Sequence, residues 1–67
     1  MDHFRLHRIS AGHYRNITGN ECWRLEPGDP GRVASLPWRL TGPEGWYGDH
    51  PTLRAAQASL YEEEETP

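Results

Sequence analysis

The chain has 67 residues, of which 34% are hydrophobic, and a formal net charge of −3 at pH 7. A chain this short forms one domain and buries only about 60% of the surface that it exposes when unfolded, so its core must be small. Cys22 is the only cysteine, which excludes an internal disulfide. Ten acidic residues against seven basic ones, all of them arginine, exclude the strongly basic surface typical of nucleic-acid-binding domains.

No apolar run approaches the roughly 20 residues that a membrane-spanning helix needs. Residues 1–5 also lack the apolar core of a signal peptide. We therefore expect a cytoplasmic protein with no membrane partner.

The first part of the chain favours short strands separated by turns. Residues 4–9 form a strand-like run, and the following stretch is rich in glycine and asparagine, which favour turns. It leaves room for a short extended piece over residues 14–17.

Residues 21–26 alternate cleanly, which is typical of a strand with one buried face. Cys22 and Arg24 point to one side, and Trp23 and Leu25 point to the other. We expect Trp23 and Leu25 to face the core.

Residues 27–32, Pro-Gly-Asp-Pro-Gly-Arg, predict a loop because proline and glycine interrupt both helix and strand. Residues 33–41 then predict the clearest strand, with apolar side chains at every second position: Ala34, Leu36, Trp38 and Leu40. Since Pro37 has no N–H to donate to a ladder, we expect an edge strand. A turn over residues 41–45 and a short return strand over residues 46–48 complete a hairpin.

A helix is predicted over residues 52–61. Thr52 is a suitable N-cap, and an apolar stripe follows at helical spacing: Leu53, Ala56, Leu60 and Tyr61. Four glutamates follow at the negative end of the helix dipole, so residues 62–67 are expected to be an acidic, frayed tail.

These elements assemble into an α+β fold, in which a small antiparallel sheet of three to four strands packs against one C-terminal helix. The single domain is expected to span residues 1–61.

Catalytic, metal and cofactor sites are not expected. His3 and His7 would lie on one strand face but about 13 Å apart, too far to share an ion, and no closely spaced ligand pair is present. Cys22 has no sequence signature of a nucleophile around it and is read as a structural cysteine.

Arg24 and Arg39 lie on strand faces opposite Trp23 and Trp38 in this interpretation. Together they could form a basic outer surface that meets phosphates or bases, which makes a nucleic-acid-binding accessory domain the alternative function.

The pattern from Trp38-x-Leu40 through Gly45-Trp46-Tyr47-Gly48 to Pro51-Thr52-Leu53-x-x-Ala56 resembles small orphan proteins of actinobacteria and their phages. It is also similar to the hairpin-plus-helix end of three-stranded DNA-binding modules such as the arm-type domains of tyrosine recombinases, which are basic where this chain is acidic. The first resemblance implies a phage-encoded or phage-derived protein.

The sequence therefore predicts a small non-enzymatic binding protein that engages a host protein or itself through an aromatic sheet face. The residues predicted to bind are Trp38, Trp46 and Tyr47. Because large exposed aromatic patches commonly mark interfaces and a two-fold dimer is the commonest way to bury one, a homodimer is expected.

Overall fold

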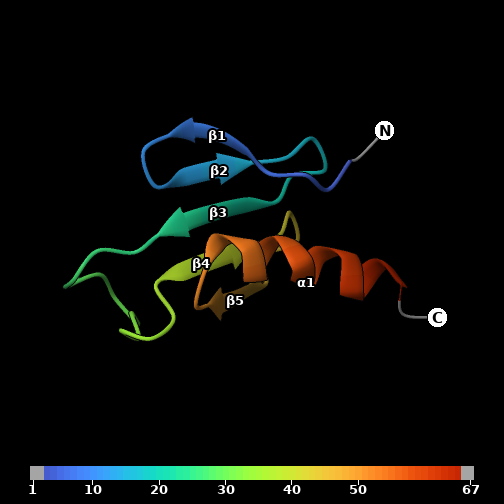
Figure 1. Ribbon diagram of the computed structural model, residues 1–67. Helices are drawn as coiled ribbons and strands as arrows, with labels where there is room; N and C mark the ends of the chain where they lie inside the picture. The colour runs from blue at the N-terminus through green and yellow to red at the C-terminus, as the bar shows by residue number, and fades with distance from the viewer. Residues whose placement is uncertain (1–2, 66–67) are drawn as a thin grey trace.

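The computed structural model describes residues 3–65, and the side chains of residues 3–61. It confirms the α+β class, with one antiparallel sheet and one C-terminal helix (Figure 1). The sheet has five strands rather than the predicted three to four, because residues 7–15 form a complete hairpin. The elements are β1 (His7–Ser10), β2 (His13–Arg15), β3 (Glu21–Arg24), β4 (Trp38–Thr41), β5 (Tyr47–His50) and α1 (Leu53–Glu65).

The strands form a meander in which each pairs with the next along the chain, in the order β1-β2-β3-β4-β5. All four pairings are antiparallel. β1 and β5 are therefore the two edges of the sheet, and α1 lies across β4 and β5 (Figure 1).

The predicted edge strand over residues 33–41 is wrong in extent and position. Only Trp38–Thr41 forms β4, and this strand lies inside the sheet between β3 and β5. Val33 and Leu36 instead close a tight turn through an isolated bridge. Pro37 stands just before β4, where its missing N–H costs no ladder bond and its carbonyl accepts a hydrogen bond from the Leu25 amide.

The turn between β2 and β3 is built around two buried asparagines. The Asn16 side-chain oxygen accepts hydrogen bonds from the backbone amides of Thr18 and Asn20 and from the Thr18 hydroxyl. Gly19 has a φ of 92°, a conformation that side chains disfavour. The turn is therefore held by specific polar contacts rather than by apolar packing.

The predicted helix over residues 52–61 is confirmed, and its backbone continues to Glu65. The Thr52 hydroxyl accepts a hydrogen bond from the Ala55 amide at 3.0 Å, so Thr52 is the N-cap as expected. The predicted acidic tail, residues 62–67, overlaps the end of this helix; its side chains and residues 66–67 lie outside the described part of the chain.

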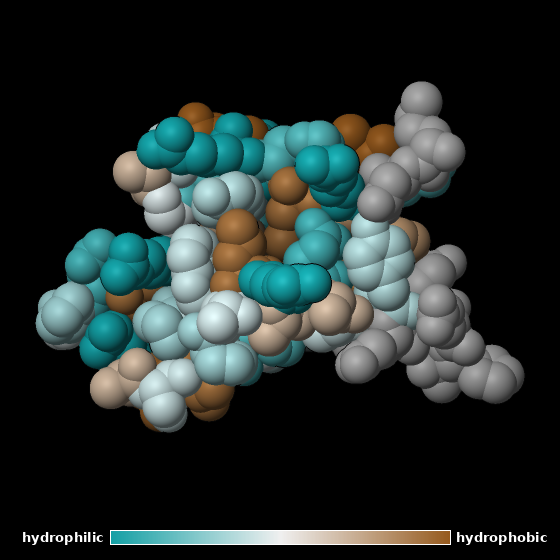
Figure 2. All heavy atoms as spheres, in the orientation of Figure 1, coloured by the Kyte–Doolittle hydropathy of each residue, from teal (hydrophilic) through white to brown (hydrophobic). Residues whose placement is uncertain are grey.

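The core lies between the sheet and α1 and contains five buried hydrophobic residues: Leu6, Cys22, Leu40, Ala56 and Leu60. Phe4, Tyr14, Trp38 and Leu53 pack around them while staying partly exposed. Seen from the α1 side, hydrophobic atoms fill the space between the β1–β2 hairpin and the helix (Figure 2).

The prediction that Trp23 faces the core is wrong. Its side chain is 42% exposed, whereas Cys22 is 0% exposed. Side chains along β3 do alternate between the two faces, but Cys22 faces the core and Trp23 faces solvent, the reverse of the prediction. Leu25 lies beyond the end of β3 and is half-buried.

The side chain of Gln57 on α1 binds the N-terminal segment through two hydrogen bonds. Its side-chain amide donates to the Phe4 carbonyl at 2.8 Å, and its side-chain oxygen accepts from the Leu6 amide at 2.6 Å. The Gln57 amide thus bonds one backbone N–H and one backbone carbonyl of this segment, as a neighbouring strand would do. These two bonds hold Leu6 over the core.

Candidate binding surface

The sheet face that points away from α1 carries the most unusual group of side chains. We call it the outer face and define it by six residues: His13, Glu21, Trp23, Arg39, Tyr47 and Asp49. The strand register places them together, because directly paired residues project to the same side and residues two apart along a strand do so as well. His13 pairs with Trp23, Trp23 with Arg39, and Arg39 with Asp49, so one row crosses four strands.

An aromatic stack forms one half of this row. The His13 imidazole and the Trp23 indole lie with their centroids 3.5 Å apart and their planes 9° apart. His13 Nε2 lies 2.9 Å from a carboxylate oxygen of Glu21, which orients the imidazole. One face of the indole is covered by His13, and 42% of the Trp23 surface remains exposed.

Arg39 organises the other half. Its Nε and Nη2 donate to the two carboxylate oxygens of Asp49 at 2.8 and 3.1 Å. Nη1 and Nη2 also donate to the backbone carbonyls of Pro30 and Gly31, at 3.4 and 3.3 Å. The guanidinium carbon stands 4.7 Å from the centroid of the Tyr47 ring, a cation–π contact.

This arrangement pairs the charges of Arg39 and Asp49 with each other, while Arg15, which the register places opposite Glu21 on the same face, is exposed. The hydrogen bond from Arg39 holds the pKa of Asp49 below its usual range, and the same bond raises the pKa of Arg39. Arg39 therefore stays paired, with four hydrogen bonds made by its five N–H groups. Little of its donor capacity is left for a phosphate.

Arg24 and Arg39, predicted to share a basic surface, lie on opposite faces of the sheet. Arg24 pairs with Trp38, one position away from the pair of Trp23 with Arg39, and successive residues of a strand point to opposite sides. The two arginines therefore do not form the basic outer surface inferred from the sequence.

The predicted binding residues Trp38, Trp46 and Tyr47 occupy three different settings. Tyr47 lies on the outer face and is 65% exposed. Trp38 lies on the opposite face, where it packs against the core and meets Tyr14 edge to face at 5.9 Å. Trp46 precedes β5 and lines a pocket at another end of the molecule.

Sequence reasoning missed His13 and Trp23 as surface residues. The signal that could have identified Trp23 was its neighbour, because cysteine is among the most often buried residue types. If Cys22 is placed in the core, strand alternation turns Trp23 outward. Nothing in the local sequence indicates that His13 stacks on it, since that contact depends on the register between β2 and β3.

Burial raises the pKa of the Cys22 thiol to about 11, so a nucleophilic thiolate is disfavoured there.

No helix within residues 3–65 combines the length and apolar character needed to cross a membrane. Comparison of the chain with protein-family models, curated proteins and solved structures finds no match. The resemblance to actinobacterial and phage proteins therefore stays a prediction.

Proposed function

We propose that this chain is a non-enzymatic binding protein and that its outer face binds a second copy of the chain. The observation that carries the proposal is the exposure of Trp23 on β3 and of Tyr47 on β5, two strands that flank β4, on the sheet face that α1 does not cover, with 42% and 65% of their surfaces exposed. Large exposed aromatic side chains are typical of interface centres, where tryptophan and tyrosine contribute most of the binding energy.

The charge pair of Arg39 with Asp49 is compatible with self-association, because two copies can meet over it without leaving either of these two charges unpaired. A two-fold arrangement brings the same patch of each copy together. In such an arrangement the Trp23 and Tyr47 rings lose their contact with water.

The charge pattern also ranks the alternatives. A nucleic-acid ligand requires arginine donors that are free to contact phosphate, and Arg39, the arginine beside Tyr47, already uses most of its donors within the chain. A second copy in a two-fold arrangement presents the same exposed Trp23 and Tyr47 to this surface, so aromatic side chains meet aromatic side chains.

Sedimentation velocity over a concentration series reaching roughly 100 µM tests this proposal. We expect a species of twice the 7.7 kDa mass of one chain at the upper end of the series. Tyr47→Glu should give a monomer, because it places an unpaired carboxylate in the interface. Ile17→Glu is the matched control, since Ile17 is 72% exposed in the β2–β3 turn, away from the outer face.

Two outcomes would overturn the proposal. One is a monomeric wild type throughout the series, which leaves the outer face to a foreign protein. The other is equal dissociation of the dimer by Tyr47→Glu and Ile17→Glu, which would place the interface elsewhere.

A further inference from the structure

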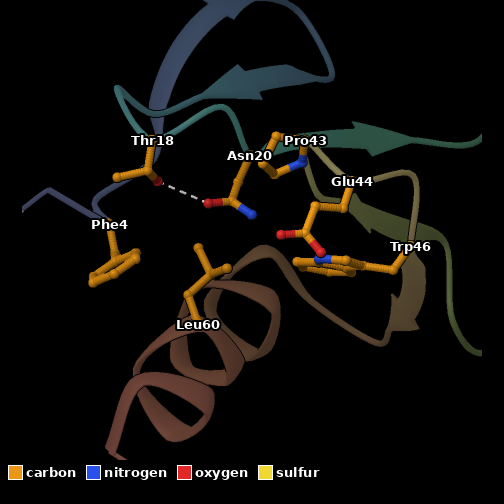
Figure 3. Close-up of a pocket in the computed structure, with 7 residues that line it drawn as sticks. All are labelled: Phe4, Thr18, Asn20, Pro43, Glu44, Trp46 and Leu60. Atoms are coloured by element: carbon orange, nitrogen blue, oxygen red, sulfur yellow. Dashed lines mark hydrogen bonds between the residues drawn. The ribbon is translucent and has the colours of Figure 1, made fainter.

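A pocket of about 370 Å³ opens where four separate segments of the chain meet (Figure 3). The N-terminal segment contributes Phe4, the β2–β3 turn contributes Asn20, and α1 contributes Leu60. The β4–β5 turn contributes Glu44 and Trp46. None of the residues that line the pocket belongs to the outer face, so this site is independent of the proposed dimer interface.

The Trp46 indole packs directly on Gly42 at the edge of this pocket. It lies so close to the backbone of Gly42 that a Cβ added there would stand 2.1 Å from a ring atom. Only glycine at position 42 permits this packing. The indole is therefore oriented before any ligand arrives, while 36% of the Trp46 surface remains exposed.

The apolar wall of the pocket comes from Phe4 and Leu60. Leu60 projects from α1 toward the β2–β3 turn, and Phe4 stands beside it (Figure 3). These side chains suit a hydrocarbon stem rather than a fully polar ligand.

The side-chain amide of Asn20, which lines another wall of the pocket, already has hydrogen-bond partners within the chain. Asn20 Oδ1 accepts from Asn16 Nδ2 at 3.1 Å and lies 2.8 Å from the Thr18 hydroxyl, whose single proton is shared between this oxygen and Asn16 Oδ1, and Asn20 Nδ2 donates to the Thr41 carbonyl at 3.4 Å. These groups shape the wall but offer a ligand few free partners.

Glu44 is different. Within the described part of the chain, its carboxylate makes no hydrogen bond or ion pair, and it points toward the Trp46 indole (Figure 3). The net charge of −3 also favours a positive ligand.

We propose that this pocket binds an organic cation, a guanidinium or alkylammonium group carried on a hydrocarbon stem. The cationic head stands between the Trp46 indole and the Glu44 carboxylate, where cation–π attraction and a charge-assisted hydrogen bond act together. The stem lies against Phe4 and Leu60. Such a cation is found on the arginine or lysine side chain of a peptide and on small free amines and guanidines.

Titration of the ¹⁵N-labelled chain, followed by NMR, tests the proposal. The probes are n-butylguanidinium, n-butylammonium, the blocked tripeptide acetyl-Gly-Arg-Gly-amide and the uncharged n-butylurea. We expect the three cationic probes to shift the Trp46 indole N–H resonance while the Trp38 indole N–H resonance stays in place. We expect the affinity for n-butylurea to be lower than that for n-butylguanidinium by about 10-fold or by a larger factor.

Two glutamine variants provide the matched comparison. Glu44→Gln removes the charge and keeps the shape of the side chain, and it should weaken cation binding about 10-fold. Glu26→Gln removes an exposed carboxylate outside the pocket and should leave binding unchanged. Both residues are exposed, so neither change is expected to disturb folding.

The probes also distinguish the two sources of the cation. Tighter binding of the tripeptide than of n-butylguanidinium assigns the pocket to a peptide side chain, and the reverse order assigns it to a small free cation. Equal binding of n-butylurea, an unmoved Trp46 resonance, or equal weakening by Glu44→Gln and Glu26→Gln would each overturn the proposal.

Discussion

His13 and Trp23 stack face to face across β2 and β3, with their ring centroids 3.5 Å apart and their planes 9° apart. This pair lies on the outer face, so it stabilises the pairing of the two strands without contributing to the core. It also holds the Trp23 indole in one orientation.

Trp23→Ala should therefore cost much less stability than a core substitution. We expect a loss of about 1 kcal/mol, the usual contribution of an aromatic pair, whereas Leu40→Ala should cost about 2–5 kcal/mol because Leu40 is 1% exposed. Urea unfolding at a protein concentration where the chain is monomeric measures both values. Equal losses would mean that Trp23 belongs to the core.

Cys22 should make stability fall at high pH. Its pKa is raised by burial from 9.0 to about 11 in the folded chain, so folding favours the protonated thiol. Below pH 9 the thiol is protonated in both states and has no effect. Between pH 9 and pH 11 the unfolded chain ionises first, and the folded state loses up to about 2–3 kcal/mol relative to it.

The Cys22→Ala variant isolates this effect, because other groups also titrate in that range. The stability difference between wild type and variant, measured by urea unfolding from pH 8 to pH 11, should move against the wild type as pH rises. The thiol should also resist a thiol reagent at pH 8 until urea is added. Rapid labelling of the folded chain would contradict the burial of Cys22.

Asp49 should contribute stability that is lost in acid. Because Arg39 lowers its pKa below the ordinary value of 3.8, the carboxylate favours folding above that pH, and the contribution disappears as pH falls through the folded-state value. Asp49→Asn should lower the urea midpoint at pH 7 and flatten the loss of stability below pH 4. Glu26→Gln, which changes an exposed carboxylate, should retain the acid response of the wild type.

Gly42→Ala should disturb Trp46 directly. The new methyl group would stand 2.1 Å from the indole, so the ring must move, at a cost of about 1–3 kcal/mol. Gly48→Ala is the control, because the nearest atom to its Cβ is His50 Nε2 at 3.7 Å. Urea unfolding and the Trp46 indole N–H resonance report the two effects, and an unmoved resonance in Gly42→Ala would contradict the close packing.

Local signals in the sequence predicted the elements whose stability is local. Thr52 caps α1 because its hydroxyl reaches a backbone amide three residues ahead, a contact that requires no other part of the chain. The β4–β5 hairpin follows from the turn over residues 42–46, where Gly45 adopts a φ of 97°. The hairpin formed by β1 and β2 was underestimated, because its two short strands carry little apolar alternation to mark them.

The sequence by itself thus determined the fold class, the helix and its cap, and the alternation of side chains along β3. The alternation along β3 did not decide which of its sides faces the core, because a period of two identifies two faces without saying which of them a helix will cover; the tertiary structure, in which Cys22 is buried, decided it. It also decided the environment of Arg39, whose partners come from β5 and from the loop at residues 30–31. The pocket beside Trp46 has the same origin, since Phe4 and Leu60 are 56 positions apart in the sequence and meet only when the N-terminal segment packs on α1.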